Sequence, residues 1–215
     1  NGRFFEVLLD NFQIEEKSYA TQFTAGTRSA TEGLKDLTGN STLDLTNVSF
    51  DSNAQMTFDG TDDLLDTNLF SGRNPSTDPF TVEAVLKADT TSGARLWIDA
   101  SGNGTNQRFY SSLDDEGGNP LGISGSAYGN SAPNTTDWTH QTIVMDGSTA
   151  RSYRNGVATN TKEYGSYTLN GDIIIGGRNG YNWSGDIALV KIYNRALTAS
   201  EIKSNFNAIK GRFNI

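Results

Sequence analysis

Short apolar segments, separated by turn-forming residues roughly every ten positions, run through most of this 215-residue chain. The breaks are rich in Gly, Asn, Asp, Ser and Thr; Gly alone contributes 23 residues, whereas Pro contributes 4. This spacing is typical of an all-β sandwich or barrel. Hydrophobic residues make up 35% of the chain, including 11 Phe, 8 Tyr and 3 Trp, which is enough to fill a core. We therefore predict one large all-β domain over residues 31–215.

Residues 1–30 differ from the rest of the chain. A plausible strand at 3–9 is followed by a polar stretch over 10–28. We interpret this region as an N-terminal arm or linker, or as the last strand of a preceding domain. Because the chain opens with Asn1 and not Met, we expect a processed product or a fragment of something longer. An arm with an isolated strand favours exchange between subunits, and so a homo-oligomer.

Three dipeptides are expected to form tight hairpin turns: Asp146-Gly147, Asn155-Gly156 and Asn170-Gly171. In such pairs both central residues adopt positive φ, and the type I′ turn that results matches the twist of the flanking strands. The sequence therefore predicts antiparallel pairing within residues 141–154, and again between 167–169 and 172–175.

Two segments predict different sheet surroundings. Residues 80–87 alternate apolar with polar side chains, which indicates a strand with one buried face and one face in water. Residues 186–193 place Ile187 and Leu189 on one face, with Val190 and Ile192 on the other. Both faces of that strand are apolar, so another element must cover its second face.

A helix near the end of the chain can supply this cover. Thr198 and Glu201 have the spacing of a capping box, in which each side chain accepts from the other's backbone N–H. Phe206 and its apolar neighbours recur on one helical face. Gly211 fits the stop position after a helix. We predict one short helix over residues 199–209, packed on the sandwich.

The charge balance excludes several kinds of partner. The net charge is −8, and the 17 basic residues are scattered and outnumbered by 25 acidic ones. Nucleic acid needs clustered Lys and Arg, so we expect no nucleic-acid binding and no adsorption to an anionic membrane. No apolar run is long enough for membrane insertion. The chain has no Cys, which excludes disulfides and mildly favours assembly in a reducing cytosol.

Five segments, in order along the chain, resemble the concanavalin A-like, laminin G-like group of domains. They are residues 58–64, 80–87, 138–140, 153–156 and 185–198, and they are spread over most of the chain from about residue 34 onward. The last segment, Gly-Asp-Ile-Ala-Leu-Val-Lys-Ile-Tyr-Asn-Arg-Ala-Leu-Thr, is the most specific. The resemblance implies an antiparallel β-sandwich of the jelly-roll type with one short C-terminal helix.

Two shorter stretches resemble virion proteins of tailed phages and cyanophages. Residues 10–23 are similar to the junction that precedes laminin G-like domains in such proteins, and residues 207–213 are similar to the end of phage structural proteins. The resemblance implies a virion component, such as a fibre, decoration or tail protein. It would be assembled in the host cytoplasm and extracellular when displayed.

Catalytic signals are weak. Glycosidases and lyases occur on this fold, so fold alone does not decide. A retaining glycosidase holds two carboxylates about 5 Å apart, and the best-spaced pair, Asp114 and Glu116, lies in a run that is typical of a solvated loop. His140 is the one His, and we interpret it as a packed or surface residue and not as a triad member. We expect no catalytic residues and no required cofactor.

Calcium is the metal that this composition could hold, since it prefers carboxylate and carbonyl oxygens. The resemblance points to Asp59, Asp62, Asp63 and Asp186 as candidate ligands. Many relatives carry an acid just after the Gly-x-Ile motif, where this chain has Ala188 and Leu189, and that departure weakens any role that depends on the acid. Solvated hairpin turns are the alternative.

Ligand binding is expected on aromatic loops, because sugars stack on aromatic faces and hydrogen bond to Asn, Asp and Arg. The candidate residues are Trp183, Tyr181, Arg178, Asn179, Tyr128 and Tyr110. Trp183 could equally pack inside the protein, because Trp is rarely fully exposed. The leading expectation is a non-catalytic module that adheres to cell-surface glycan. The alternatives are a structural domain that contacts neighbouring virion subunits and, less favoured, a polysaccharide-active enzyme domain.

Overall fold

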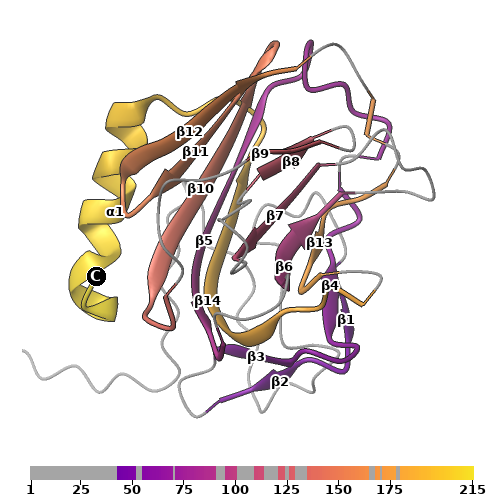
Figure 1. Ribbon diagram of the computed structural model, residues 1–215, viewed down its shortest axis with the longest axis vertical. Coiled ribbons are helices and arrows are strands. Elements are labelled where there is room, and N and C mark those ends of the chain that lie inside the picture. The colour runs from indigo at the N-terminus through magenta and orange to yellow at the C-terminus, as the bar shows by residue number, and fades with distance from the viewer. Residues whose placement is uncertain are drawn as a thin grey trace, which may run out of the picture.

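The computed structural model describes residues 43–51, 55–69, 71–90, 95–100, 109–113, 121–123, 126–128, 135–164, 168–169, 171–177 and 180–215. Within these residues, two antiparallel sheets stack face to face, and one helix lies against the outside of the second sheet (Figure 1). The predicted β-sandwich with a C-terminal helix is confirmed. The N-terminal arm and its boundary near residue 31 lie outside the described residues.

In the part of the chain that the structure describes, each sheet has seven strands that pair with antiparallel neighbours. The first sheet has the order β1 (Asp44–Thr46), β4 (Leu64–Asp66), β13 (Ile174–Ile175), β6 (Arg95–Asp99), β7 (Phe109–Leu113), β8 (Leu121–Ile123) and β9 (Ser126–Tyr128). The second has the order β12 (Val157–Glu163), β11 (Thr149–Arg154), β10 (Thr139–Asp146), β5 (Phe80–Ala88), β14 (Ser184–Tyr193), β3 (Met56–Asp59) and β2 (Ser49–Phe50). The helix is α1 (Ala199–Phe213).

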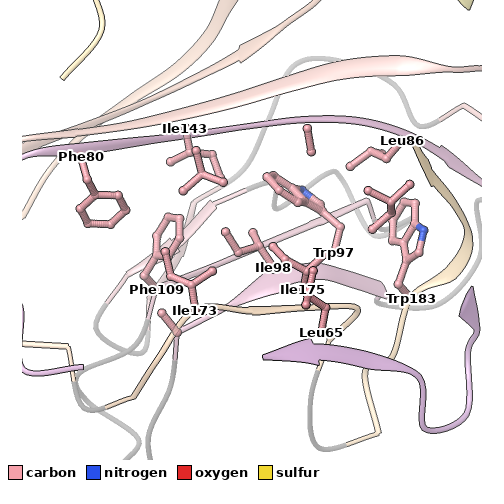
Figure 2. Packing of buried hydrophobic residues seen from close by; sticks show 14 of the residues in the cluster. Leu65, Phe80, Leu86, Trp97, Ile98, Phe109, Ile143, Ile173, Ile175 and Trp183 are labelled. Carbon is pink, nitrogen blue, oxygen red and sulfur yellow. The ribbon is translucent and has the colours of Figure 1, made fainter. Parts of the chain in front are cut away.

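The main core fills the space between the sheets. Figure 2 shows Trp97 and Phe109 of the first sheet pointing toward Phe80 and Ile143 of the second. The rings of Phe80 and Phe109 meet edge to face with centroids 5.8 Å apart. The indole N–H of Trp97 donates to Ser111 Oγ at 2.9 Å, so this buried polar group is satisfied.

The outer face of the second sheet is also buried, which corrects the prediction that β5 has one face in water. Thr81 and Glu83 point away from the core, yet they are 0% and 1% exposed. The reason is α1, which covers this face (Figure 1). A second apolar cluster forms there, with Val144, Tyr153, Leu197 and Ile202 as its buried members. The covering helix itself is confirmed.

A β-bulge changes the predicted faces of β14. Ile187 pairs with Leu86, but Leu189 pairs with the next residue, Val85, so one extra residue of β14 stands between them. Ile187, Val190 and Ile192 therefore face the core, whereas Leu189 turns outward. The prediction that Ile187 and Leu189 share a face was wrong, because regular alternation assumes an unbroken ladder.

Helix α1 begins as predicted but ends later. Thr198 Oγ1 accepts from the N–H of Glu201 at 3.3 Å, and Glu201 Oε2 accepts from the N–H of Thr198 at 2.8 Å. The helix runs through Gly211 to Phe213 and is capped by Asn214 at φ 56°. Phe213 packs against Trp138 at 5.2 Å between ring centroids. This contact extends the helix beyond the predicted Gly stop.

The three predicted turns have different outcomes. Asn155 and Gly156 have φ of 50° and 73°, which confirms the type I′ turn between β11 and β12. Asp146 pairs with Thr149, so the first turn centres on Gly147 and Ser148, one residue later than predicted. Asn170 lies outside the described residues. The hairpin predicted there was wrong, because β13 is hydrogen bonded to β4 on one side and to β6 on the other.

No helix in the described part of the chain combines the length and the apolar character that crossing a membrane requires.

Candidate ligand-binding site

An acidic turn between β3 and β4 lies at one end of the sandwich. Carboxylate oxygens of Asp59, Asp62 and Asp63 all lie within 4.8 Å of one another. Asp59 Oδ1 accepts from the N–H of Thr61 at 2.7 Å, and Asp63 Oδ2 accepts from the N–H of Asp59 at 2.5 Å. Gly60 has φ 81°, which lets the backbone reverse between these acids. The turn therefore gathers negative charge in a fixed geometry.

The three acids differ in exposure. Asp59 and Asp62 are exposed, whereas Asp63 is 6% exposed. Burial raises the pKa of Asp63 above its ordinary value, and the charges of Asp59 and Asp62 raise it further, against the lowering effect of the hydrogen bond from the Asp59 N–H. A positive charge placed among the three carboxylates would reverse this repulsion.

Two asparagines from distant segments hold the acidic turn. Asn47, in the turn between β1 and β2, donates from Nδ2 to Asp62 Oδ2 at 2.8 Å. Asn182 donates from its side-chain Nδ2 to the carbonyl oxygen of Thr61. The second contact joins the acidic turn to the segment 180–184, which leads into β14. We call the acidic turn and this segment together the rim site.

The segment 180–184 is held tightly at its base. The N–H of Leu96 donates to the carbonyl of Tyr181 at 2.9 Å, and the N–H of Trp183 donates to the carbonyl of Gly176 at 2.8 Å. At Gly177, φ is 97° and an added Cβ would lie 2.5 Å from the carbonyl oxygen of Tyr181. This close approach requires glycine, so the ring of Tyr181 projects from a fixed backbone.

The structure separates the two aromatic candidates of this segment. Tyr181 is 49% exposed and is available to a ligand. Trp183 is 0% exposed and points into the main core (Figure 2). The expectation that Trp183 forms a binding platform is therefore corrected in favour of the alternative, packing inside the protein. The physical reason is that Trp183 lies directly before β14, where its ring packs with the main cluster between the two sheets.

Two of the other predicted binding residues, Tyr110 and Tyr128, lie on strands away from Tyr181. Arg178 and Asn179 lie outside the described residues. Tyr110 pairs with Asp99 at the far end of β6 from Leu96, the neighbour of the rim site. Tyr128 is on β9, three strands away from β6, which corresponds to about 14 Å across the sheet. The backbone positions of Tyr110 and Tyr128 therefore separate them from the rim site.

Asp186 also stands apart from the acidic turn. It lies on β14 opposite Thr57 and Lys87, and its Oδ1 accepts from Thr57 Oγ1 at 3.2 Å. Among the described residues, the group whose geometry suits a metal consists of Asp59, Asp62 and Asp63. The expectation that Asp186 belongs with them is corrected. In β14 it is Ser184 that pairs with Asp59, and Asp186 lies two residues further along the strand.

Of the residues considered for catalysis, His140 alone lies among the described residues. Asp114 and Glu116 lie outside the described residues. His140 is 1% exposed and stacks on Phe206 of α1 with ring centroids 6.0 Å apart. Burial lowers the pKa of His140 to about 4, and the positive charge of Lys191 adds to the effect. The interpretation of His140 as a packed residue is confirmed.

Sequence reasoning missed the residues that join the parts of the rim site. Asn47 and Asn182 lie 15 and 121 residues from their partners, so no local spacing relates them. Ser184 Oγ, which donates to Asp89 Oδ2 at 3.0 Å, is another such link. A local signal existed for Asn47 alone, whose φ of 57° is typical of Asn in a tight turn.

Two stacked antiparallel sheets with a loop-built candidate site at one end define a β-sandwich of the jelly-roll type. Residues 59–203, more than half of the chain, match the family described as the concanavalin A-like lectin/glucanases superfamily. The chain belongs to this family. A search of curated proteins finds no match.

Solved structures show the same fold at low sequence identity. Domain 4 of an extracellular arabinanase from Geobacillus stearothermophilus, in complex with arabinotriose, has a TM-score of 0.64 at 18% identity, over 79% of this chain and 90% of that one. The binding domain of Paraclostridial Mosquitocidal Protein 1 has 0.59 at 19%, over 81% and 49%. The binding domain of botulinum neurotoxin serotype G has 0.57 at 16%, over 78% and 46%. This chain thus spans about half the length of the two toxin domains.

Proposed function

We propose that this protein is a non-catalytic binding module that holds a cell-surface glycan at the rim site. The observation that carries the proposal is the exposed ring of Tyr181 on a backbone fixed by Gly177, beside an acidic turn held by Asn182. Three of the similar solved structures are binding domains, and a fourth was solved with an oligosaccharide.

The chemistry of the rim site suits a sugar. An aromatic ring offers a flat apolar face to the C–H groups of a pyranose or furanose ring. The carboxylates of Asp59 and Asp62 are exposed and can accept hydrogen bonds from hydroxyl groups. Because backbone hydrogen bonds to Leu96 and Gly176 fix the segment 180–184, this segment loses little conformational freedom when a ligand binds.

Substitution of Tyr181 tests the site. We expect Tyr181→Ala to weaken binding of the best glycan on an array of neutral oligosaccharides, arabinotriose among them, by about tenfold, because one stacking contact is lost. Tyr181→Phe keeps the ring and should retain binding. Val157→Ala removes another exposed apolar side chain, 60% exposed on β12, and should leave binding unchanged. Equal binding by Tyr181→Ala and the native protein would place the ligand elsewhere.

Turnover would contradict the non-catalytic part of the proposal. A part of Trypanosoma rangeli sialidase, 29% of that chain, has the same fold, with a TM-score of 0.60 at 17% identity over 76% of this chain. If a glycan bound by this protein were hydrolysed, and hydrolysis vanished in Asp114→Ala or Glu116→Ala, the module would be a polysaccharide-active enzyme domain.

We also propose that the acidic turn takes a calcium ion. Asp59, Asp62 and Asp63 offer three carboxylates within 4.8 Å, which fits a hard cation that prefers oxygen ligands. The raised pKa of Asp63 reflects burial and mutual repulsion, both of which a bound cation would offset. The ion would brace the turn that Asn182 contacts, and so support the loop that carries Tyr181.

Removal of calcium should lower thermal stability. At a free calcium concentration 100 times its Kd, binding stabilises the folded state by about 2.7 kcal/mol, and EGTA should lower Tm by roughly 8 °C. Asp62→Asn keeps the shape of an exposed side chain but removes its charge, so EGTA should lower the Tm of this variant by less. Calorimetry of the native protein and the variant, each with calcium and with EGTA, measures the two Tm differences. An identical Tm in calcium and EGTA would rule the site out.

The context that we propose is a tailed-phage particle, with this module in a fibre, decoration or tail component. The support is the resemblance of residues 10–23 and 207–213 to virion proteins. The alternative is a structural domain that contacts neighbouring subunits, in a homo-oligomer joined through the N-terminal arm. Absence of glycan binding, together with ordered contacts through the arm in assembled particles, would favour that alternative.

A further inference from the structure

A buried polar cluster lies beneath α1, on the face of the second sheet that points away from the core. Its centre is Glu83 on β5, which is 1% exposed. Glu83 Oε2 accepts from Tyr193 Oη at 3.0 Å. Asn205 of α1 donates from Nδ2 to both carboxylate oxygens, at 3.1 and 2.9 Å. The side chain of Asn205 therefore ties the helix to the middle of the sheet.

His140 completes the cluster and also contacts the helix. Its Nε2 lies 3.7 Å from Glu83 Oε1, and its ring stacks on Phe206 at an interplanar angle of 25°. Nδ1 of His140 and Oγ1 of Thr142 are buried without a hydrogen-bond partner among the described residues. Within the described part of the chain, a protonated imidazole therefore has no acceptor for the N–H on Nδ1 while α1 is in place.

The surroundings oppose a positive charge on His140. Burial and the charge of Lys191 lower the pKa of His140 from its ordinary 6.5 to about 4. Glu83 Oε1 lies 3.7 Å from His140 Nε2, which is beyond hydrogen-bond distance, and the two oxygens of Glu83 are held in place by hydrogen bonds from Tyr193 and Asn205. Besides His140, the titratable and charged groups on the elements packed here are Glu83 and Lys87 of β5, Asp146 of β10, Arg151, Tyr153 and Arg154 of β11, Asp186, Lys191 and Tyr193 of β14, and Glu201, Lys203, Lys210 and Arg212 of α1.

We propose that α1 is an acid-released strap: a proton taken up by His140 detaches the helix from the second sheet while the core between the two sheets stays folded. Two features of the structure support local release. The cluster under α1, which includes Val144 and Ile202, is separate from the main core. Helix α1 also follows the described strands in sequence and pairs with none of them, so its release breaks no strand pairing.

The direction of the pH dependence follows from the two states of His140. In the closed form the pKa is about 4, whereas in the open form it returns to the ordinary 6.5. The open form therefore binds the proton more tightly, and acid favours opening between these two values. From pH 7 to pH 5 the equilibrium constant for opening should rise roughly 20-fold by this linkage.

Hydrogen exchange measured by mass spectrometry tests the strap. After correction for the intrinsic pH dependence of exchange, protection of the α1 amides should fall by roughly 20-fold between pH 7 and pH 5. Amides of β6 should keep their protection over the same range. Equal loss of protection in α1 and β6 would mean that acid unfolds the whole domain, and no change in α1 would equally overturn the strap.

Two variants and one direct titration identify the group responsible. His140→Phe keeps a ring against Phe206 but takes up no proton, so protection of α1 should no longer depend on pH. Asn205→Leu removes the tie to Glu83 and should lower protection of α1 at both pH values while the pH-dependent factor remains. His140 is the one His in the chain, so its NMR titration in the native protein is unambiguous. A midpoint near 6.5, or an unchanged pH response in His140→Phe, would overturn the proposal.

Discussion

Gly185→Ala is expected to destabilise the folded protein by about 4 kcal/mol, which corresponds to a fall in Tm of roughly 12 °C. Gly185 lies in β14 between Phe58 of β3 and Ala88 of β5. Its φ of 136° is one that side-chain-bearing residues rarely adopt, and an added Cβ would lie 2.1 Å from the carbonyl oxygen of Lys87. The neighbour is backbone in the centre of a sheet, so it cannot move aside without breaking a ladder.

Gly180→Ala provides the matched control for this prediction. Gly180 has φ 82°, and an added Cβ there meets nothing within 4 Å. Gly180→Ala therefore has the cost of placing a side chain at positive φ but no steric clash. We expect it to destabilise the folded protein by about 1 kcal/mol. Urea denaturation of both variants measures the difference. If the two substitutions cost the same, the close approach of Gly185 to β5 does not determine stability.

Trp183→Ala is expected to cost about 4 kcal/mol of folding free energy, because it leaves a large cavity in a packed core. Trp183 is fully buried among the apolar residues of the main cluster. Its indole N–H has no hydrogen-bond partner among the described residues. Trp183→Phe should therefore cost far less than Trp183→Ala, since it keeps most of the volume and removes an unsatisfied polar group.

The pair Trp183→Ala and Tyr181→Ala separates packing from binding. Tyr181 is half exposed, so its loss should weaken glycan binding and leave the midpoint of denaturation unchanged. Trp183→Ala should shift the midpoint strongly and affect binding through the fraction of folded protein. If Trp183→Ala abolished glycan binding at an unchanged denaturation midpoint, Trp183 would contact the ligand and our placement of it in the core would be wrong.

Local sequence signals predicted several elements because neighbouring residues determine them. The turn at Asn155 and Gly156 follows from the tolerance of these two residues for positive φ. The start of α1 follows from Thr198 and Glu201, whose side chains satisfy each other's backbone N–H groups. The alternation in residues 80–87 correctly gave the core-facing side of β5. None of these features depends on a distant part of the chain.

Tertiary contacts decided the rest. Glu83 is a polar residue at an outward position, and it is buried because a helix more than 100 residues later lies over it. Helix α1 continues past Gly211 to Phe213, whose ring packs against Trp138 in a distant segment of the chain. The bulge in β14 arose where that strand pairs with β5, so the sequence of β14 alone gave no sign of it.

The candidate site shows the same division. The sequence by itself determined which short segments are rich in acids, aromatics and glycine, and it indicated the acidic turn at Asp59, Asp62 and Asp63. Only the tertiary structure decided that Tyr181 is exposed, that Trp183 is buried, and that Asn182 joins its segment to the acidic turn. The physical reason is that exposure and contact depend on which distant strands become neighbours, whereas turn and capping chemistry act within a few residues.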